Sequence, residues 1–171
     1  MDIIVMKSPL ISFQDIYKKY ANDVFRFAFY LCGNQDDAKD ITSETFVRLW
    51  TSRNSLIDKT LKAFLFTIAR NLFLQRVRNR KRQVDFDSQW IDPTPLPDSA
   101  YATRLELKAV LKAMQGLPDV DRMALLMKTQ HDFSYGEIAE ILNISVAAIK
   151  VKIHRSRIKL LEFSSLEKEN E

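Results

Sequence analysis

Glycine is scarce in this chain, with 3 residues among 171, where average usage would give roughly a dozen. The turns and bulges of β-sheets rely on glycine because it adopts positive φ angles at little cost. The shortage therefore argues against a sheet-rich protein and favours long helices. Hydrophobic residues make up 46% of the chain, which is too many for a disordered protein. We therefore predict an all-α fold.

The cysteine count and the hydrophobic segments exclude further classes. Cys32 is the single cysteine, so no intrachain disulfide can form, and a reducing compartment, the cytoplasm, is the expected location. The N-terminus has an acidic second residue and a short apolar run, which is not a secretory signal. No stretch approaches the ~20 apolar residues that cross a bilayer.

Helical periodicity predicts three helices in the first half of the chain, at about 13–32, 36–50 and 61–82. Ser12 is a good N-cap for the first, and Gly33 with Asn34 would end it. Residues 83–103 then contain three of the five prolines, four aspartates and no basic residue. We interpret this stretch as a linker, because ~20 structureless residues are unusual as a loop inside one compact domain. The predicted organisation is a domain at 1–84, a linker at 85–103 and a second domain at 104–171.

The C-terminal half predicts a helix-turn-helix. Ser134 and Glu137 have the spacing of a capping box that opens a short helix, Asn143 lies in the turn, and Ser145 caps a final helix reaching about Phe163. On that last helix, a buried stripe is expected at Val146, Ile149, Ile153 and Leu160.

The opposite face of the last helix is cationic, with no acidic residue from 150 to 159. Small residues near its start would allow close approach to a DNA major groove, and long cations would reach phosphates. The alternative is an amphipathic helix whose basic face is merely solvated. The candidate DNA contacts are Lys150, Val151, Lys152, His154, Arg155 and Arg157.

Two faces in the first half carry opposite charge. The 61–82 helix has a narrow polar arc with Arg70, Asn71, Arg78 and Lys81, which suits a nucleic-acid backbone but also an ordinary basic helix end. The 36–50 helix exposes a mostly acidic face that would repel DNA and suits protein docking. Its candidate residues are Asp37, Asp40, Glu44, Val47 and Arg48.

Two long segments resemble a sigma factor of bacterial RNA polymerase, of the extracytoplasmic-function type. The first is FQDIYKKYANDVFRFAFYLCGNQDDAKDITSETFVRLW with KAFLFTIARNLFLQRVRNRKR, which looks like region 2. The second is LPDVDRMALLMKTQHDFSYGEIAEILNISVAAIKVKIHRSRIKLLEF, which looks like region 4. The pair in this order is far more specific than either segment alone.

The resemblance implies a function in promoter-specific transcription initiation. The acidic helix would dock on the clamp coiled coil of the β′ subunit of the polymerase core, and the β flap is a second expected contact. The first domain would recognise and melt the −10 element of promoter DNA, and the last helix would read the −35 element. The residues implied at the −10 element are Asp58, Lys59, Thr60, Lys62, Arg70, Asn71, Arg78 and Lys81. A membrane-bound anti-sigma factor is a further expected partner.

Two other functions remain as alternatives. A free-standing helix-turn-helix regulator would have no need of an acidic docking face followed by an arginine-rich helix. An enzyme would need a nucleophile, base or metal set, but His131, His154 and Cys32 lie in different elements and no glycine-rich phosphate loop is present. The prediction is therefore a protein that is not an enzyme, with no cofactor, no metal and no small-molecule substrate.

Overall fold

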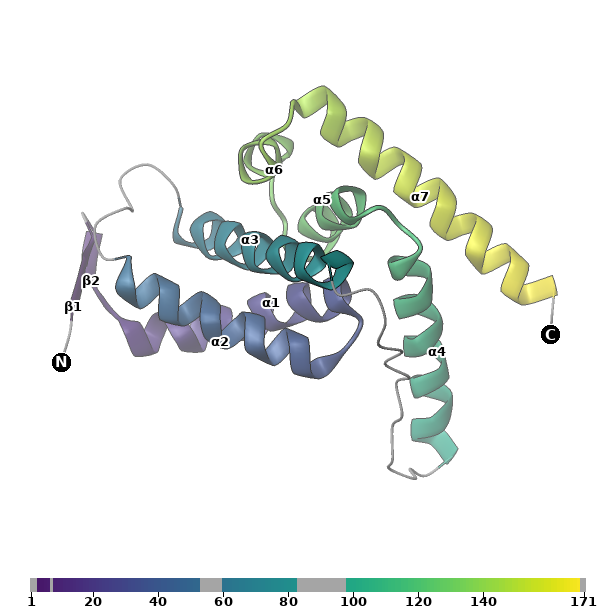
Figure 1. Cartoon of the computed structure of the whole chain (residues 1–171), viewed down its shortest axis with the longest axis horizontal. Coiled ribbons are helices and arrows are strands. Elements are labelled where there is room, and N and C mark those ends of the chain that lie inside the picture. The colour runs from purple at the N-terminus through teal and green to yellow at the C-terminus, as the bar shows by residue number, and fades with distance from the viewer. Residues whose placement is uncertain (1–2, 7, 53–59, 83–97, 170–171) are drawn as a thin grey trace.

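The computed structural model describes the backbone of residues 3–6, 8–52, 60–82 and 98–169. Within these ranges it contains seven helices and one antiparallel hairpin (Figure 1), and the predicted all-α class is confirmed. The hairpin was not predicted. It pairs β1 (Ile3–Met6) with β2 (Ser8–Ser12), with Ile3 opposite Ser12. The hairpin precedes α1, and all the later described elements are helices.

The first three helices begin and end at the local signals expected from the sequence. They are α1 (Phe13–Cys32), α2 (Gln35–Thr51) and α3 (Leu61–Arg82). The Ser12 hydroxyl accepts from the Asp15 backbone N–H at 3.1 Å and caps α1. Gly33 ends α1 at φ 76°, a left-handed conformation that costs other residues roughly 1–2 kcal/mol. Its hydrogen bond from N–H to the Phe29 carbonyl closes the last turn.

The apolar faces of these helices share a dense core. Phe27, Ile41, Leu49, Leu65 and Phe66 are all at most 1% exposed. Burying each such side chain contributes about 1.5–3 kcal/mol. This core holds α2 and α3 in a fixed orientation, so the polar faces that they present outward are positioned by packing.

Helix α4 (Asp98–Gln115) begins inside the interval 85–103 that was expected to be linker, so the last six residues of that interval are helical. Residues 83–97, which carry the rest of the predicted linker, lie outside the described residues. Figure 1 shows α4 extending away from the other helices.

Three further helices follow: α5 (Asp119–Gln130), α6 (Tyr135–Leu142) and α7 (Val146–Glu169). Helix α7 continues six residues beyond Phe163, where we expected it to end. In Figure 1, α6 and α5 lie beside α3, while α7 extends toward the C-terminus. The helix-turn-helix therefore lies against the N-terminal helices.

The buried residues form one core that continues from α1 and α3 into α5 and α6. The Phe66 ring on α3 contacts the Phe133 ring at a centroid distance of 4.9 Å. Phe133 lies between α5 and α6 and is 3% exposed. The N-terminal and C-terminal halves are thus joined by apolar packing as well as by the chain.

Candidate nucleic-acid and protein-docking surfaces

The start of α6 and the turn between α6 and α7 have the capping geometry predicted from the sequence. The Ser134 N–H donates to the Glu137 carboxylate at 2.8 Å, and the Glu137 N–H donates to the Ser134 hydroxyl at 3.2 Å. These hydrogen bonds lower the pKa of Glu137. Asn143 then ends α6 at φ 55°, and the Ser145 hydroxyl caps α7 through the Ala148 N–H. The local sequence thus fixes the angle at which α7 leaves α6.

Helix α7 is anchored by one apolar stripe. Ile149 and Ile153 are 0% and 2% exposed, and Leu160 is partly buried. Val146, which was expected in the same stripe, is 41% exposed. It is the first residue of α7. The expectation for Val146 was wrong.

The outer face of α7 carries most of the predicted DNA contacts. His154, Arg155 and Arg157 are exposed, as are Lys150 and Val151. The Lys150 ammonium lies 5.6 Å from the centre of the Tyr135 ring, which orients it at the N-terminal end of the face. Such a surface, with long cations around the exposed apolar side chains of Val151 and Ile158, can enter a major groove.

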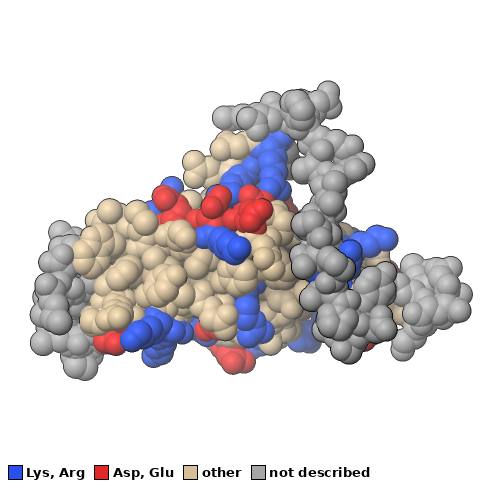
Figure 2. All heavy atoms as spheres, turned by 90° about the horizontal axis from the view of Figure 1, so that it is seen from below, with Lys and Arg blue, Asp and Glu red and all other residues tan. Residues whose placement is uncertain are grey.

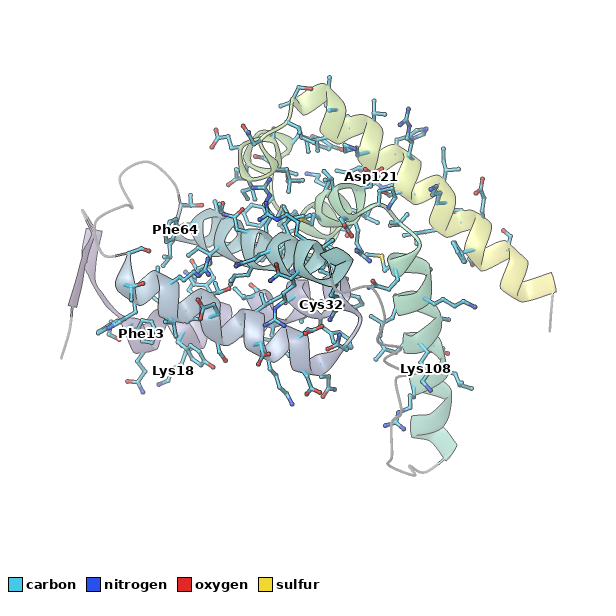
Figure 3. The ribbon with its side chains drawn as sticks, viewed as in Figure 1. Phe13, Lys18, Cys32, Phe64, Lys108 and Asp121 are labelled. Carbon is cyan, nitrogen blue, oxygen red and sulfur yellow. The ribbon has the colours of Figure 1, made fainter. Side chains whose placement is uncertain are left out.

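Lys152 occupies a different environment from its neighbours. Its ammonium donates to the Asp121 carboxylate on α5 at 2.8 Å. The Asp121 side chain is only 10% exposed and that of Lys152 is 31% exposed. Figure 3 shows Asp121 between α5 and α7. In this structure Lys152 therefore ties α7 to α5 and points away from the exposed face.

The candidate −10 residues are spread along α3 and are not equally available. Thr60 is exposed, and its hydroxyl caps α3 through the Ala63 N–H. Arg70 donates to the Asn71 side chain at 3.0 Å, while its buried Nε has no hydrogen-bond partner. Arg78 is exposed. Asp58 and Lys59, and the side chain of Lys81, lie outside the described residues.

Lys62 is the exception on α3, because it contacts the C-terminal half. Its ammonium donates to the His131 carbonyl at 2.5 Å and lies 5.0 Å from the centre of the Phe133 ring. Both groups belong to the segment that joins α5 to α6. Helical periodicity does not indicate this contact, since Lys62 and His131 are 69 residues apart.

The acidic face of α2 is partly neutralised by α3. Arg76 and Arg80 both bind the Asp37 carboxylate, and Arg76 also reaches Asp40 at 3.4 Å. Partial burial works to raise the pKa of Asp37, but the hydrogen bond from Asn34 and the charges of Arg80 and Arg76 outweigh it and lower the pKa. Asp37 thus serves mainly to join α2 to α3. Its arginine partners are four residues apart on α3, a spacing that places them on one helix face.

The other predicted docking residues remain accessible. Asp40 has a side-chain exposure of 69%, and Val47 is 54% exposed. Glu44 pairs with Arg48 within α2 at 2.9 Å, and both side chains are more than 40% exposed. Figure 2 shows acidic and basic side chains next to each other on the face viewed from below. The available docking surface is therefore a mixed one, with acids, one arginine and an exposed valine.

Cys32 lies in a buried environment that does not activate its thiol. Burial, with a smaller contribution from Asp37, raises the pKa of Cys32 to about 12, which makes it a poor nucleophile. Cys32 lies at the end of α1 (Figure 3).

The described residues contain no group of three or more His, Cys, Asp or Glu able to hold a metal ion. None of the described helices is both long enough and apolar enough to span a bilayer.

Comparisons with known proteins agree with this arrangement. Residues 16–83 match Sigma-70 region 2, and residues 107–160 match Sigma-70, region 4. The chain is 35% identical over 150 residues to the ECF RNA polymerase sigma factor SigM of Bacillus subtilis, covering 85% of this chain and 91% of SigM. It is 31% identical over 158 residues to SigE of Mycolicibacterium smegmatis, covering 89% of this chain but 61% of SigE.

A solved structure is similar over almost the whole chain. The sigma factor RpoE of Bartonella quintana, in complex with the anti-sigma factor NepR, superimposes with a TM-score of 0.75 at 28% identity, covering 90% of this chain and 96% of RpoE. The chain belongs to the sigma-70 family, with the regions 2 and 4 of an ECF RNA polymerase sigma factor.

Proposed function

We propose that this chain directs promoter-specific transcription initiation by combining three surfaces. A domain at 1–84 docks on the β′ clamp coiled coil of the polymerase core and binds the −10 element. A domain at 104–171 contacts the β flap and reads the −35 element, and a linker at 85–103 connects the two. It acts in the cytoplasm as a binding subunit, not as an enzyme.

The observation that carries this proposal is the position of the charges relative to the two matched regions. Region 4 presents the exposed cations of α7, and region 2 presents the exposed face of α2, where Asp40, Glu44 and Val47 are accessible. A cationic face attracts phosphate, and a mixed face with an apolar centre suits a protein partner. A free-standing helix-turn-helix regulator is not favoured, because it would not account for region 2.

Within α7, we propose that Val151, His154 and Arg155 reach base edges and that Lys150 and Arg157 bind phosphates. Lys152 is not part of this surface while it is paired with Asp121. Among the −10 candidates whose side chains are described, Thr60, Asn71 and Arg78 are exposed, whereas Lys62 and Arg70 are partly buried. Asp58 and Lys59 remain proposed contacts of that element.

An anti-sigma factor is a further proposed partner. The supporting observation is the likeness, over 96% of its length, to a sigma factor solved with the anti-sigma factor NepR. We expect the partner of this chain to be anchored in the membrane, as the resemblance to extracytoplasmic-function sigma factors implied.

Run-off transcription tests the proposal. The purified chain is mixed with core polymerase and a library of promoter fragments, and transcripts are sequenced. We expect initiation at a defined set of fragments that share −35 and −10 motifs, and none with core alone. Binding of the free chain to an operator, with no initiation in the presence of core, would support the regulator instead.

A further inference from the structure

An apolar line of side chains runs along the centre of the exposed face of α7. We call it the ridge, and its members are Ala147, Val151, His154 and Ile158. They follow one another at intervals of three or four residues, which places them on one side of the helix. Val151 and Ile158 are 47% and 43% exposed, and the other two members are also exposed. Single exposed apolar side chains are common on protein surfaces, but here they form a continuous line.

Exposed cations lie on both sides of the ridge. At about 100° per residue, Lys150 and Arg157 lie roughly 70–90° from the mean direction of the ridge on one side. Arg155 and Lys159 lie roughly 70–110° from it on the other side. All four are exposed. An apolar strip between two rows of cations is complementary to a major groove, where base edges lie between two phosphate backbones, so duplex DNA is the occupant that fits this face.

Val151 is the ridge member that is placed to reach a base through apolar contact. In helix-turn-helix proteins, the N-terminal residues of the second helix contact the base edges. Ala147, one turn before Val151, is small enough to let the helix approach closely. Lys152, the next residue in the chain, does not cover the base edges beside Val151, because its ammonium binds Asp121 on α5 at 2.8 Å (Figure 3).

The base edges of a major groove are polar with one exception. Guanine presents N7 and O6, adenine presents N7 and an amino group, and cytosine presents an amino group. Thymine adds an apolar C5 methyl group to its O4 acceptor. An aliphatic side chain that displaces water from a polar edge leaves that edge without a hydrogen bond, which costs free energy. Against a methyl group, the same side chain buries apolar surface on both partners.

We infer that Val151 selects a thymine in the element read by α7, by packing against the C5 methyl group of that base. This inference rests on the proposed function and adds to it a chemical requirement on the DNA sequence. His154 is the ridge member that can form hydrogen bonds with a base. The flanking cations bind phosphates and hold the helix in register.

Replacement of thymine by uracil tests this contact, because uracil also pairs with adenine and lacks only the C5 methyl group. A promoter selected by run-off transcription is remade with uracil at each thymine of its −35 element in turn, on both strands. The affinity of the reconstituted holoenzyme is then measured for each duplex. We expect one thymine whose replacement weakens binding roughly fourfold, the factor for one buried methyl-sized group.

Val151→Ser connects the effect to the side chain. It removes both methyl groups of the valine at an exposed position, so circular dichroism should show unchanged helix content. On the thymine promoter this variant should bind roughly fourfold more weakly. The uracil that weakens wild-type binding should cause no further loss in the variant, because the two changes remove the same contact.

Leu161→Ser is the matched control. Leu161 is another aliphatic residue of α7, 69% exposed and outside the ridge. It lies about 15 Å farther along the helix than Val151. The control should therefore retain the full response to uracil.

A holoenzyme that binds the selected promoter but responds to no uracil would overturn the inference and leave the proposed function intact. An equal response to uracil in Val151→Ser and wild type would also overturn it. A chain that selects no promoter would contradict the proposed function, and the methyl contact with it. A free chain that sediments as a dimer, and as a monomer with Val151→Ser, would overturn the inference by assigning the ridge to a second copy of the chain.

Discussion

Lys152 on α7 donates a hydrogen bond to the Asp121 carboxylate on α5 across 2.8 Å, so one of the cations expected on the DNA face is used inside the protein. The adjacent Lys150 is exposed and rests near the Tyr135 ring. Two lysines of the same helix, both in a run without acids, therefore have different environments.

Lys152→Met should lower the stability of the protein, because the carboxylate of Asp121 is left nearly buried without its cation. We expect a loss of about 1–2 kcal/mol, less than for a fully buried pair because Lys152 is partly exposed. Urea unfolding measures this loss in the free energy of unfolding. Lys150→Met is the matched control and should instead weaken promoter binding with little change in stability. Equal stability of the two variants would contradict the assignment.

Arg155→Ala should weaken recognition of the −35 element by about 1–3 kcal/mol if the guanidinium contacts a base. Sequence preference at that position should relax at the same time. The measurement is the affinity of the reconstituted holoenzyme for a set of −35 point variants. Arg157→Ala provides the comparison and should weaken binding to all of these −35 sequences equally. A uniform loss with Arg155→Ala would assign that residue to a phosphate.

Asp40→Lys combined with Glu44→Lys should abolish association with core polymerase and leave the fold intact. Both side chains are largely exposed, so the change reverses the charge of the α2 face without disturbing the core. Co-purification with core measures the effect. Lys39→Glu with Gln35→Glu, at other exposed positions of α2, provides a comparison away from the assigned contacts. Normal core binding by the Asp40 and Glu44 variant would refute the docking assignment.

Acid should destabilise the folded protein through His131. Burial lowers the pKa of His131 to about 4 in the folded protein, against 6.5 for the free side chain. Because the folded protein binds the proton less readily than the unfolded chain, its stability falls as the pH drops from about 6.5 toward 4, by on the order of 2–3 kcal/mol. The facing charged groups are Asp23 and Arg26 on α1, Lys62 on α3, and Asp132 beside the ring.

The check is the free energy of unfolding, measured by urea unfolding across that pH range, with His131→Gln as control. The control side chain does not titrate, so its pH dependence should be flatter. An identical pH dependence in the two proteins would assign the acid response to other groups. Asp37, whose pKa is lowered, contributes stability that disappears only at lower pH, below its ordinary value.

Much of the fold follows from local signals. Ser12, Gly33, Ser134 and Asn143 each act on backbone groups within about four residues, so their sequence positions suffice to place helix ends. The apolar stripes of α1, α2 and α3 likewise identify the core. The start of α4 at Asp98 was not predicted, because the prolines at 93, 95 and 97 indicate a linker whose expected extent includes the residues after them.

The environment of the charged side chains could not be predicted in the same way. Asp37 contacts Arg76 and Arg80 about 40 residues away, and Lys62 contacts His131 after 69 residues. Such pairs depend on how helices pack, and helical periodicity gives the face of a residue but not its neighbour. The sequence therefore predicted the candidate surfaces, while the structure separated the side chains that bind within the protein from those that remain exposed.

Transcription from reconstituted holoenzyme tests the central claim most directly. The free chain, core polymerase alone and their mixture are each given the same promoter library, and the transcript start sites are sequenced. We predict that only the mixture initiates, at sites preceded by shared −10 and −35 motifs, and that the Asp40→Lys, Glu44→Lys variant does not. A mixture that initiates no more than core alone, although the chain is folded and bound to core, would contradict the account.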